Sequence, residues 1–409
     1  MVADRINNYK SIILKGFVCM KLKRYYIILK EILFNIITSP VLLMPLKNNK
    51  VVFSNFNGKG FGDNPKYIAD ELLMSDDIDM VWLVSSYSVY TPKRIRKVKI
   101  GTLRAYFELR TAKVWVDNIR NTMKPSKRKK QFYIQTWHGS YGPKLAEGEI
   151  VEHLSTDYKK KAKKDGYFCD LILSGNKLQE IQMRNFFWLN KKTEIMRVGL
   201  PRNDSLLNSV YTKRRNDEIR KKININENVK VFLYMPTYRD NGDEDVYRIN
   251  FDYLIEALEN DYDNVIILLR LHPNVKFDSS ELISEKVIDL SEYPDPQDLL
   301  IVSDFLITDY SSAAFDFSLL KKPIFLYVPD YQEYKSYRGI SPIFEEYPFP
   351  KAFSIEQLIS LIDNFDAVEY TKKISSFFEK YESYETGISA NIIANKIKSI
   401  INNEKEVEK

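Results

Sequence analysis

Residues 306–319, Leu-Ile-Thr-Asp-Tyr-Ser-Ser-Ala-Ala-Phe-Asp-Phe-Ser-Leu, form the most informative stretch of the chain. An apolar run ends at Thr308-Asp309, a pair of hydroxyl side chains follows, and apolar residues then return at helical spacing. This pattern predicts a strand, a tight turn and a helix. A helix that begins at Ser311-Ser312 would present free N–H groups and the positive end of its dipole, which favour phosphate. Taken alone, the same pair is more typical of an ordinary helix cap.

Short apolar runs alternate with helical stretches on either side of this segment, in two series. The runs of the first series are 51–53, 80–84, 112–116, 132–137, 171–174 and 195–198, and those of the second are 231–234, 265–269, 287–290, 304–307 and 324–327. Alternation of this kind predicts α/β domains whose parallel sheets are covered by helices on both faces. The charged stretch 211–229 is helical in pattern without a strong apolar face, and it is the candidate linker.

We therefore predict two Rossmann-like domains, 51–210 and 211–409, that face each other across a cleft. The last helix of the chain is a candidate to pack back on the first domain. In open α/β sheets ligands bind beyond the carboxyl ends of the strands. The unusual polar clusters of this chain lie at those ends, so the cleft is the expected site.

Composition excludes several classes of protein. The chain has 409 residues, of which 44% are hydrophobic and 28% charged, as in a soluble globular protein of two domains. Two cysteines, Cys19 and Cys169, make no disulfide framework and lack metal-binding spacing, which fits a reducing compartment. No HExxH, GxSxG or CxxC motif occurs, and no acidic cluster requires a metal. Accordingly, neither a metal nor a cofactor is predicted.

The positive charge is concentrated in residues 1–50. Nine basic and two acidic residues give this segment a net charge of +7, so the remaining 359 residues carry −1. A nucleic-acid-binding protein would carry its charge on the folded body, so no nucleic-acid partner is expected. The longest uncharged run, 32–46, has fifteen residues and two prolines, whereas a membrane span needs roughly 20 apolar residues. The segment therefore predicts a basic amphipathic helix on an anionic membrane surface. The alternative, a helix that covers the first domain, stays open.

Two of the three histidines directly follow predicted strands in opposite halves of the chain. His138 ends a strand in Trp137-His138-Gly139, and His272 ends another in 269–273, Leu-Arg-Leu-His-Pro. A single histidine is more often a surface or core residue. Equivalent positions in the two halves favour a functional role, and histidine is a suitable general base near neutral pH.

Arginines also follow two of the predicted strands. Arg202 lies in an Arg-Asn-Asp cluster, and Arg239 follows the first strand of the second half. A guanidinium group at a strand end suits bidentate binding of phosphate, although a capped turn with a surface ion pair is the simpler interpretation. The glycine-rich segment 57–60 lacks the spacing of a nucleotide-binding loop, so it is expected only to lie near the cleft.

Six segments in order along the chain resemble the CDP-glycerol glycerophosphotransferase family of teichoic-acid primases and polymerases. They are 63–68, 136–139, 199–204, 235–240, 269–273 and 308–312. The resemblance implies a two-Rossmann, GT-B-like fold without a bound dinucleotide. It also implies peripheral attachment to the cytoplasmic face of the cell membrane, where a lipid-linked saccharide or polyol-phosphate acceptor is found.

The resemblance further implies roles for individual residues. His138 corresponds to the family's expected base, and His272 is expected at the donor phosphates. The residues expected to bind the donor phosphates or nucleotide are Arg239, Thr308, Ser311 and Ser312. Further candidate cleft residues are Arg202, Asn203, Asp204, Arg270 and Asp309. Residues 140–145 depart from the family pattern beside the acceptor, so acceptor identity is left open.

The predicted function is transfer of a polyol phosphate, glycerol phosphate in preference to ribitol phosphate, from CDP-glycerol to an acceptor hydroxyl with release of CMP. Three alternatives stay open: a CDP-ribitol-dependent transferase, a nucleotide-sugar glycosyltransferase on the same fold, and a non-catalytic membrane-bound scaffold that binds polymer. Retention of both histidines, His138 and His272, argues against the scaffold, because binding alone does not need a general base.

Overall fold

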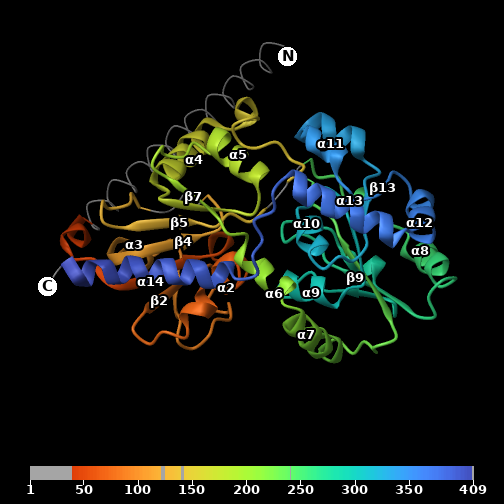
Figure 1. The fold of residues 1–409 in the computed structure, drawn as a ribbon, viewed down its shortest axis with the longest axis horizontal. Helices are drawn as coiled ribbons and strands as arrows, with labels where there is room; N and C mark the ends of the chain where they lie inside the picture. Colours follow the sequence, from red (N-terminus) through yellow and green to blue (C-terminus); the bar gives the residue numbers. More distant parts are fainter. Residues whose placement is uncertain (1–38, 121–124, 140–141, 240, 408–409) are drawn as a thin grey trace, which may run out of the picture.

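The computed structural model describes residues 39–120, 125–139, 142–239 and 241–407, which form two lobes side by side (Figure 1). Most of the predicted basic segment, residues 1–38, lies outside the described residues. The predicted segment extended to residue 50, but its last residues belong to the first lobe, because the first strand already begins at Lys47. Lys50 within this strand is fully buried and pairs with Glu108 at 2.6 Å, so its charge is not available to a membrane.

Within the described residues, the first lobe contains a seven-stranded parallel sheet in the order β3-β2-β1-β4-β5-β6-β7. The strands are β1 (Lys47–Ser54), β2 (Asp79–Val84), β3 (Arg96–Lys99), β4 (Ala112–Asp117), β5 (Phe132–Gln135), β6 (Leu171–Ser174) and β7 (Glu194–Arg197). The helices of this lobe are α2 (Asp63–Leu72), α3 (Leu103–Thr111), α4 (Thr156–Phe168) and α5 (Lys177–Phe186). Every residue of β4 is buried, as expected for a parallel strand covered on both faces.

The second lobe contains a six-stranded parallel sheet in the order β10-β9-β8-β11-β12-β13, again within the described residues. Its strands are β8 (Lys230–Met235), β9 (Val265–Leu269), β10 (Val287–Asp289), β11 (Phe305–Thr308), β12 (Ile324–Tyr327) and β13 (Lys351–Ala352). Its helices are α8 (Phe251–Leu258), α9 (Pro296–Val302), α10 (Ala313–Ser318), α11 (Tyr331–Arg338), α12 (Ile355–Asp363) and α13 (Ala367–Lys380). Short 3-10 helices complete the two lobes: η1 (Ser39–Leu43), η2 (Phe56–Gly58), η3 (Val151–His153), η4 (Pro201–Asn203), η5 (Asp245–Tyr247), η6 (Ser279–Leu282) and η7 (Pro342–Glu346).

Both sheets have the Rossmann strand order, which confirms the predicted fold class. All eleven apolar runs quoted from the sequence correspond to strands. Two strands were not predicted, β3 and β13. In β3 only Val98 is buried among charged residues, and β13 has two residues, so neither contains the apolar run on which the prediction depended.

Two segments of chain connect the lobes. The first passes from β7 through η4 to α6 (Asp204–Leu207) and α7 (Ser209–Lys222). The stretch expected to be a linker is thus largely the helix α7, which lies against α9 and buries Ile219 in the core of the second lobe. The second segment returns from α13 to α14 (Ser389–Val407), which runs across the first lobe against α2 (Figure 1).

The last helix is integral to the first lobe. Ile393, Ile397 and Ile401 of α14 are buried in the same apolar cluster as the central strands of the first sheet. The carboxylate of Asp204 accepts hydrogen bonds from the backbone N–H groups of Ser389 and Ala390 at 2.9 and 2.7 Å, and so caps the start of α14. Of the helices described, none combines the length and the apolar character needed to cross a membrane.

Candidate active site

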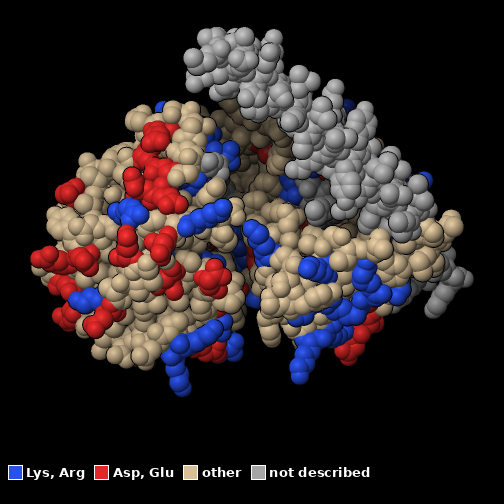
Figure 2. Space-filling model, turned by 180° about the vertical axis from the view of Figure 1, so that it is seen from behind, with Lys and Arg blue, Asp and Glu red and all other residues tan. Residues whose placement is uncertain are grey.

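The strand order reverses between β1 and β4 in the first sheet and between β8 and β11 in the second. Ligands of such sheets bind at these positions, beyond the carboxyl ends of the strands. His138 follows β5, beside β4, and Ser311-Ser312 follow β11. The two loops meet between the lobes, since a Cβ placed on Gly139 would lie 3.5 Å from Ser312 Oγ. Figure 2 shows this molecule from behind, with Lys and Arg side chains on both rims of the groove between the lobes.

The imidazole of His138 is held in a defined orientation. Its Nδ1 lies 2.7 Å from the backbone oxygen of Asn118, and its ring lies against Trp137 and Phe56 with centroids 4.6 and 5.4 Å apart. Burial lowers the pKa of His138 below its ordinary value, against the opposing effects of the Asn118 hydrogen bond and the Asp63 carboxylate. The imidazole is therefore neutral at pH 7, as a general base must be.

The backbone around His138 is strained. Trp137 and Asp63 have φ angles of +54° and +52°, a left-handed conformation that residues other than glycine rarely adopt. Phe56 and Asn57, in the loop after β1, have φ angles of +41° and +56°. Residues in such conformations persist only where surrounding contacts impose them, and they gather at functional sites.

On the second lobe, buried polar contacts shape the turn after β11. The carboxylate of Asp309 accepts from the N–H of Thr237 at 2.9 Å and from its hydroxyl at 2.6 Å. The hydroxyl of Thr308 donates to the backbone oxygen of Met235 at 2.6 Å. Thr308 and Asp309 are both buried, and their hydrogen bonds join the ends of β8 and β11. A direct contact of Thr308 with a donor stays a prediction.

The two serines of this turn are only half-buried. Ser311 Oγ accepts a hydrogen bond from the N–H of Ala313 at 3.2 Å, and the Ser312 hydroxyl lies beside Gly139. The helix α10 begins at Ala313, two residues later than the sequence pattern predicted, and Ser312 occupies its N-cap position without a side-chain cap hydrogen bond. The serines thus lie in the turn that approaches Gly139, directly after His138.

Arg239 lies in a buried network behind this turn. Its guanidinium contacts Asp309 at 2.7 Å and Asp330 at 2.7 Å, and it donates to the backbone oxygen of Thr237 at 2.7 Å. It also lies over the ring of Tyr310, 5.1 Å from the centroid. In this arrangement Arg239 positions the turn from behind, and its expected contact with phosphate stays a prediction.

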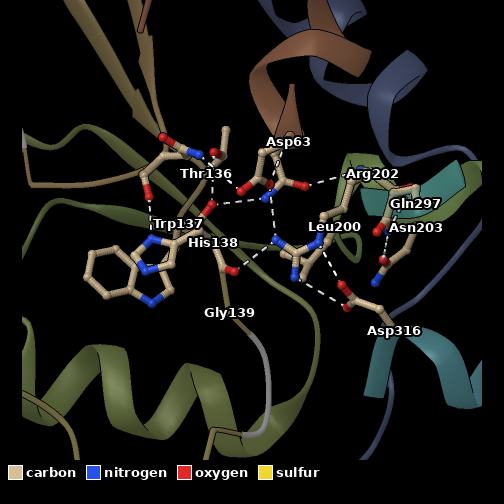
Figure 3. Close-up of polar contacts among 12 residues, drawn as sticks. Asp63, Thr136, Trp137, His138, Gly139, Leu200, Arg202, Asn203, Gln297 and Asp316 are labelled. Atoms are coloured by element: carbon tan, nitrogen blue, oxygen red, sulfur yellow. Dashed lines mark hydrogen bonds and ion pairs between the residues drawn. The ribbon is translucent and has the colours of Figure 1, made fainter. Parts of the chain in front are cut away.

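Arg202 joins the lobes (Figure 3). Its guanidinium donates to Asp316 in α10 of the second lobe at 2.8 Å, and to Asp63 at the start of α2 at 3.0 Å. It also donates to the backbone oxygen of His138 at 2.9 Å. Arg202 is therefore an ion-paired joint between the His138 loop, α2 and α10. The sequence pattern suggested a phosphate ligand or a surface ion pair, whereas this ion pair is buried.

The neighbours of Arg202 have similar roles. Asn203 donates to Glu385 at 3.0 Å and accepts from Gln297 of the second lobe at 3.1 Å. Asp204 caps α14, as described above. The side chain of Asn203 is bound between the lobes and that of Asp204 at the start of α14, and their expected place on the cleft surface stays a prediction.

His272 is exposed after β9. Its Nδ1 accepts from the N–H of Asn274 at 3.2 Å, and its ring centroid lies 5.8 Å from that of Tyr238. Arg270 donates to the backbone oxygens of Leu290 and Tyr293 at 3.1 and 2.7 Å, and burial lowers its pKa.

The glycine-rich loop lies near this part of the second lobe. Lys59 of the first lobe lies 3.4 Å from the side-chain oxygen of Asn274, which places the loop at the cleft beside the His272 turn. Across the residues described, no three His, Cys, Asp or Glu side chains converge as metal ligands would.

The residues of this site that sequence reasoning missed include Asn118, Asp316 and Glu385. Asn118 follows β4, and the criterion that selected His138 would have found it if applied to that strand. Asp316 lies inside a short helix and Glu385 in a connecting segment, so no local pattern distinguishes them.

Comparison with known proteins identifies a family and relatives that are similar to this chain. Residues 36–399 match the family described as CDP-Glycerol:Poly(glycerophosphate) glycerophosphotransferase. A teichoic acid poly(glycerol phosphate) polymerase of Bacillus spizizenii is 32% identical over 399 residues, which cover 92% of this chain and 98% of that protein. A polymerase of the same description from Staphylococcus epidermidis is 32% identical over 86% of this chain. This chain spans about half of that relative, 51% of its length.

Two further comparisons bear on the donor. A teichoic acid ribitol-phosphate primase of Bacillus spizizenii is more distant, 27% identical over 88% of this chain and 93% of that protein. A solved structure of a variant of the wall teichoic acid polymerase TagF, soaked with CDPG, has a TM-score of 0.79 and 30% identity. That likeness covers 88% of this chain and 90% of the solved chain.

The joint at Arg202 yields a stability prediction. Replacing Arg202 with Met leaves the carboxylates of Asp63 and Asp316 buried without their partner, and should lower the free energy of unfolding by about 3–5 kcal/mol. Urea unfolding followed by tryptophan fluorescence measures this loss. The control Arg214→Met removes an exposed pair with Glu218 and should change stability by less than about 1 kcal/mol. Equal stability of the two variants would contradict the role of Arg202 as a stabilising joint between the lobes.

Proposed function

The chain belongs to the CDP-glycerol:poly(glycerophosphate) glycerophosphotransferase family, and we propose that it transfers glycerol phosphate from CDP-glycerol to an acceptor hydroxyl, releasing CMP. The observation that carries this proposal is the approach of the His138 loop to the Ser311-Ser312 turn across the cleft. The relatives support glycerol over ribitol, because those named for glycerol phosphate are more similar than the ribitol-phosphate primase.

His138 acts as the general base in this proposal. With Nδ1 bound to the Asn118 carbonyl, Nε2 carries the lone pair and accepts the proton of the acceptor hydroxyl. The acceptor oxygen forms a bond to the β-phosphorus of the donor as the bond from that phosphorus to the CMP oxygen breaks. The glycerol phosphate group is thereby joined to the acceptor, and CMP leaves with the electron pair of the broken bond.

The second lobe holds the donor in the same scheme. Phosphoryl transfer depends on positioning and on stabilising charge at the phosphate oxygens. Hydrogen-bond donors to the phosphates come from the hydroxyls of Ser311 and Ser312 and from the exposed ring of His272. Arg270, two residues before His272 in the sequence, adds a positive charge. Arg239 and Asp309 hold the turn in place from the interior.

The direct test is a product assay. Purified protein is supplied in parallel with CDP-glycerol, CDP-ribitol and a UDP-sugar, together with a synthetic lipid-linked disaccharide. We expect CMP release and a product heavier by glycerol phosphate with the first donor alone. Preferred use of CDP-ribitol or of the UDP-sugar would replace the proposal with the corresponding alternative, and turnover of none of them would favour a binding role.

The pH dependence tests the base. Because burial lowers the pKa of His138 and the base must be neutral, kcat/KM should stay high to a pH below the ordinary histidine value of 6.5 before it falls.

His138→Ala should lower kcat by roughly 10²–10⁴-fold and leave donor affinity nearly unchanged. His153→Ala, at an exposed position in η3, is the control. Near-normal turnover of His138→Ala would remove it from this role.

We further propose that the protein acts at the cytoplasmic face of the membrane on a lipid-linked acceptor, attached through its N-terminal segment. Residues 1–38 contain seven basic and two acidic residues. A basic residue near an anionic surface contributes about 1 kcal/mol, so this segment suffices for reversible attachment.

Deletion of residues 1–38 should release the protein from phosphatidylglycerol vesicles while transfer to a soluble acceptor analogue persists. Vesicle sedimentation at rising salt measures attachment, which should weaken as the charges are screened. A folded truncation that sediments as strongly as the full chain would contradict this attachment. An unfolded truncation, detected by circular dichroism, would instead support the segment as a cover of the first lobe.

A further inference from the structure

Asn118, directly after β4, uses its side chain to join three segments of the first lobe. It is fully buried. Its side-chain oxygen accepts from the N–H of Phe56 at 3.0 Å, and its side-chain nitrogen donates to Asn55 Oδ1 at 2.8 Å. The same nitrogen donates to Asp63 Oδ2 at 3.0 Å. Its backbone oxygen is the group that contacts His138, so the side chain anchors the peptide that orients the imidazole.

These contacts close a ring of hydrogen bonds around the base. From Asn118 the ring passes to Asp63, whose other carboxylate oxygen lies 3.0 Å from Arg202. Arg202 then donates to the backbone oxygen of His138 at 2.9 Å (Figure 3). His138 is thus bound twice, through its ring by Asn118 and through its backbone by Arg202.

We propose that Asn118 and Asp63 are positioning residues that keep His138 protonated at Nδ1 with the Nε2 lone pair available to accept a proton. The kinetic part of this inference rests on the proposed function, whereas the ring of contacts does not. Neither residue touches the reacting atoms in this scheme, and both act through His138.

The chemistry of the groups explains the assignment. Neutral imidazole has one N–H donor and one acceptor nitrogen, and a backbone carbonyl only accepts. A carbonyl fixed at Nδ1 therefore selects the tautomer with Nε2 unprotonated. An amide is required at position 118, because its side chain must accept from Phe56 and donate to Asn55 and Asp63 at once.

The ring also places two opposite charges beside the imidazole. The carboxylate of Asp63 favours the protonated form of His138, and the guanidinium of Arg202 disfavours it. Removing Asp63's charge alone would take away the effect that favours the protonated form and leave the opposing effect of Arg202, which keeps its partner Asp316. Arg202 also holds Asp316 in α10, directly after the Ser311-Ser312 turn, so the base and the proposed phosphate turn share one network.

The experiment compares Asn118→Ala and Asp63→Asn by NMR of ¹⁵N-labelled histidine side chains, which reports tautomer and pKa without any substrate. The chain has only three histidines, and a His138→Gln spectrum identifies the signal of His138. In the unaltered protein we expect protonation at Nδ1 and a pKa below 6.5. Protonation at Nε2 in the unaltered protein would overturn the proposal.

The two variants are expected to move the pKa in opposite directions. Asn118→Ala should admit water, mix the two tautomers and raise the His138 pKa towards its ordinary value. Asp63→Asn, which is nearly isosteric, should lower the pKa further because the cation of Arg202 remains. General loosening of the structure would raise it in both variants, so a shared upward shift would overturn the proposal. The nearly isosteric variant keeps the test decisive if Asn118→Ala does not fold.

Kinetics supply the second readout. With CDP-glycerol, each variant should lose at least about ten-fold in kcat with little change in KM for the donor, and the acid limb of its pH profile should follow the NMR pKa. Asn395→Ala, at an exposed position on α14, is the matched control. If the unaltered protein does not use CDP-glycerol, the proposed function fails while NMR still decides the inference. If the two variants change KM but leave kcat and the pH profile unaltered, the positioning role of Asn118 and Asp63 is overturned.

Discussion

A buried guanidinium between two carboxylates fixes how the two lobes of this protein meet. The side chain of Arg202 is 6% exposed, and its partners Asp63 and Asp316 belong to different lobes. Burial opposes the charge of Arg202, but the carboxylates outweigh that effect and raise its pKa, so it stays a cation. Such a group is tolerated in the interior only with its partners in place. The relative position of α2, α10 and the His138 loop follows from this requirement.

In the proposed function, transfer between substrates held on different lobes needs this constraint. Reacting groups must be aligned within about an ångström of the productive geometry, and the proposed base and the proposed phosphate turn lie on separate sheets. The return of α14 to the first lobe joins the sheets a second time. Glu385, in that returning segment, accepts from the N–H of Leu200 at 3.1 Å and binds Asn203. Burial raises its pKa to about 8, so it adds little negative charge to the joint at neutral pH.

The sequence predicted the architecture well because the signals for it are local. Buried parallel strands are continuous apolar runs, and each run quoted from the sequence became a strand. The edge strand β3 was missed because charged residues surround its one buried side chain, Val98. Positions at the carboxyl ends of strands were equally visible, and they led to His138 and to Ser311 and Ser312 in the turn that approaches the His138 loop.

The sequence by itself thus determined most of the secondary structure, the two-lobed α/β class and the set of polar side chains that leave the strand ends. Only the tertiary structure decided which of them face the cleft and which lie inside. Arg202 and Arg239 have the same local setting as a phosphate-binding arginine, yet each is paired with carboxylates from distant segments, Asp316 for one and Asp330 for the other. The charge balance of a buried side chain is set by residues far away along the chain. Local pattern carries no record of them, so the role of each arginine emerged only when the sheets were brought together.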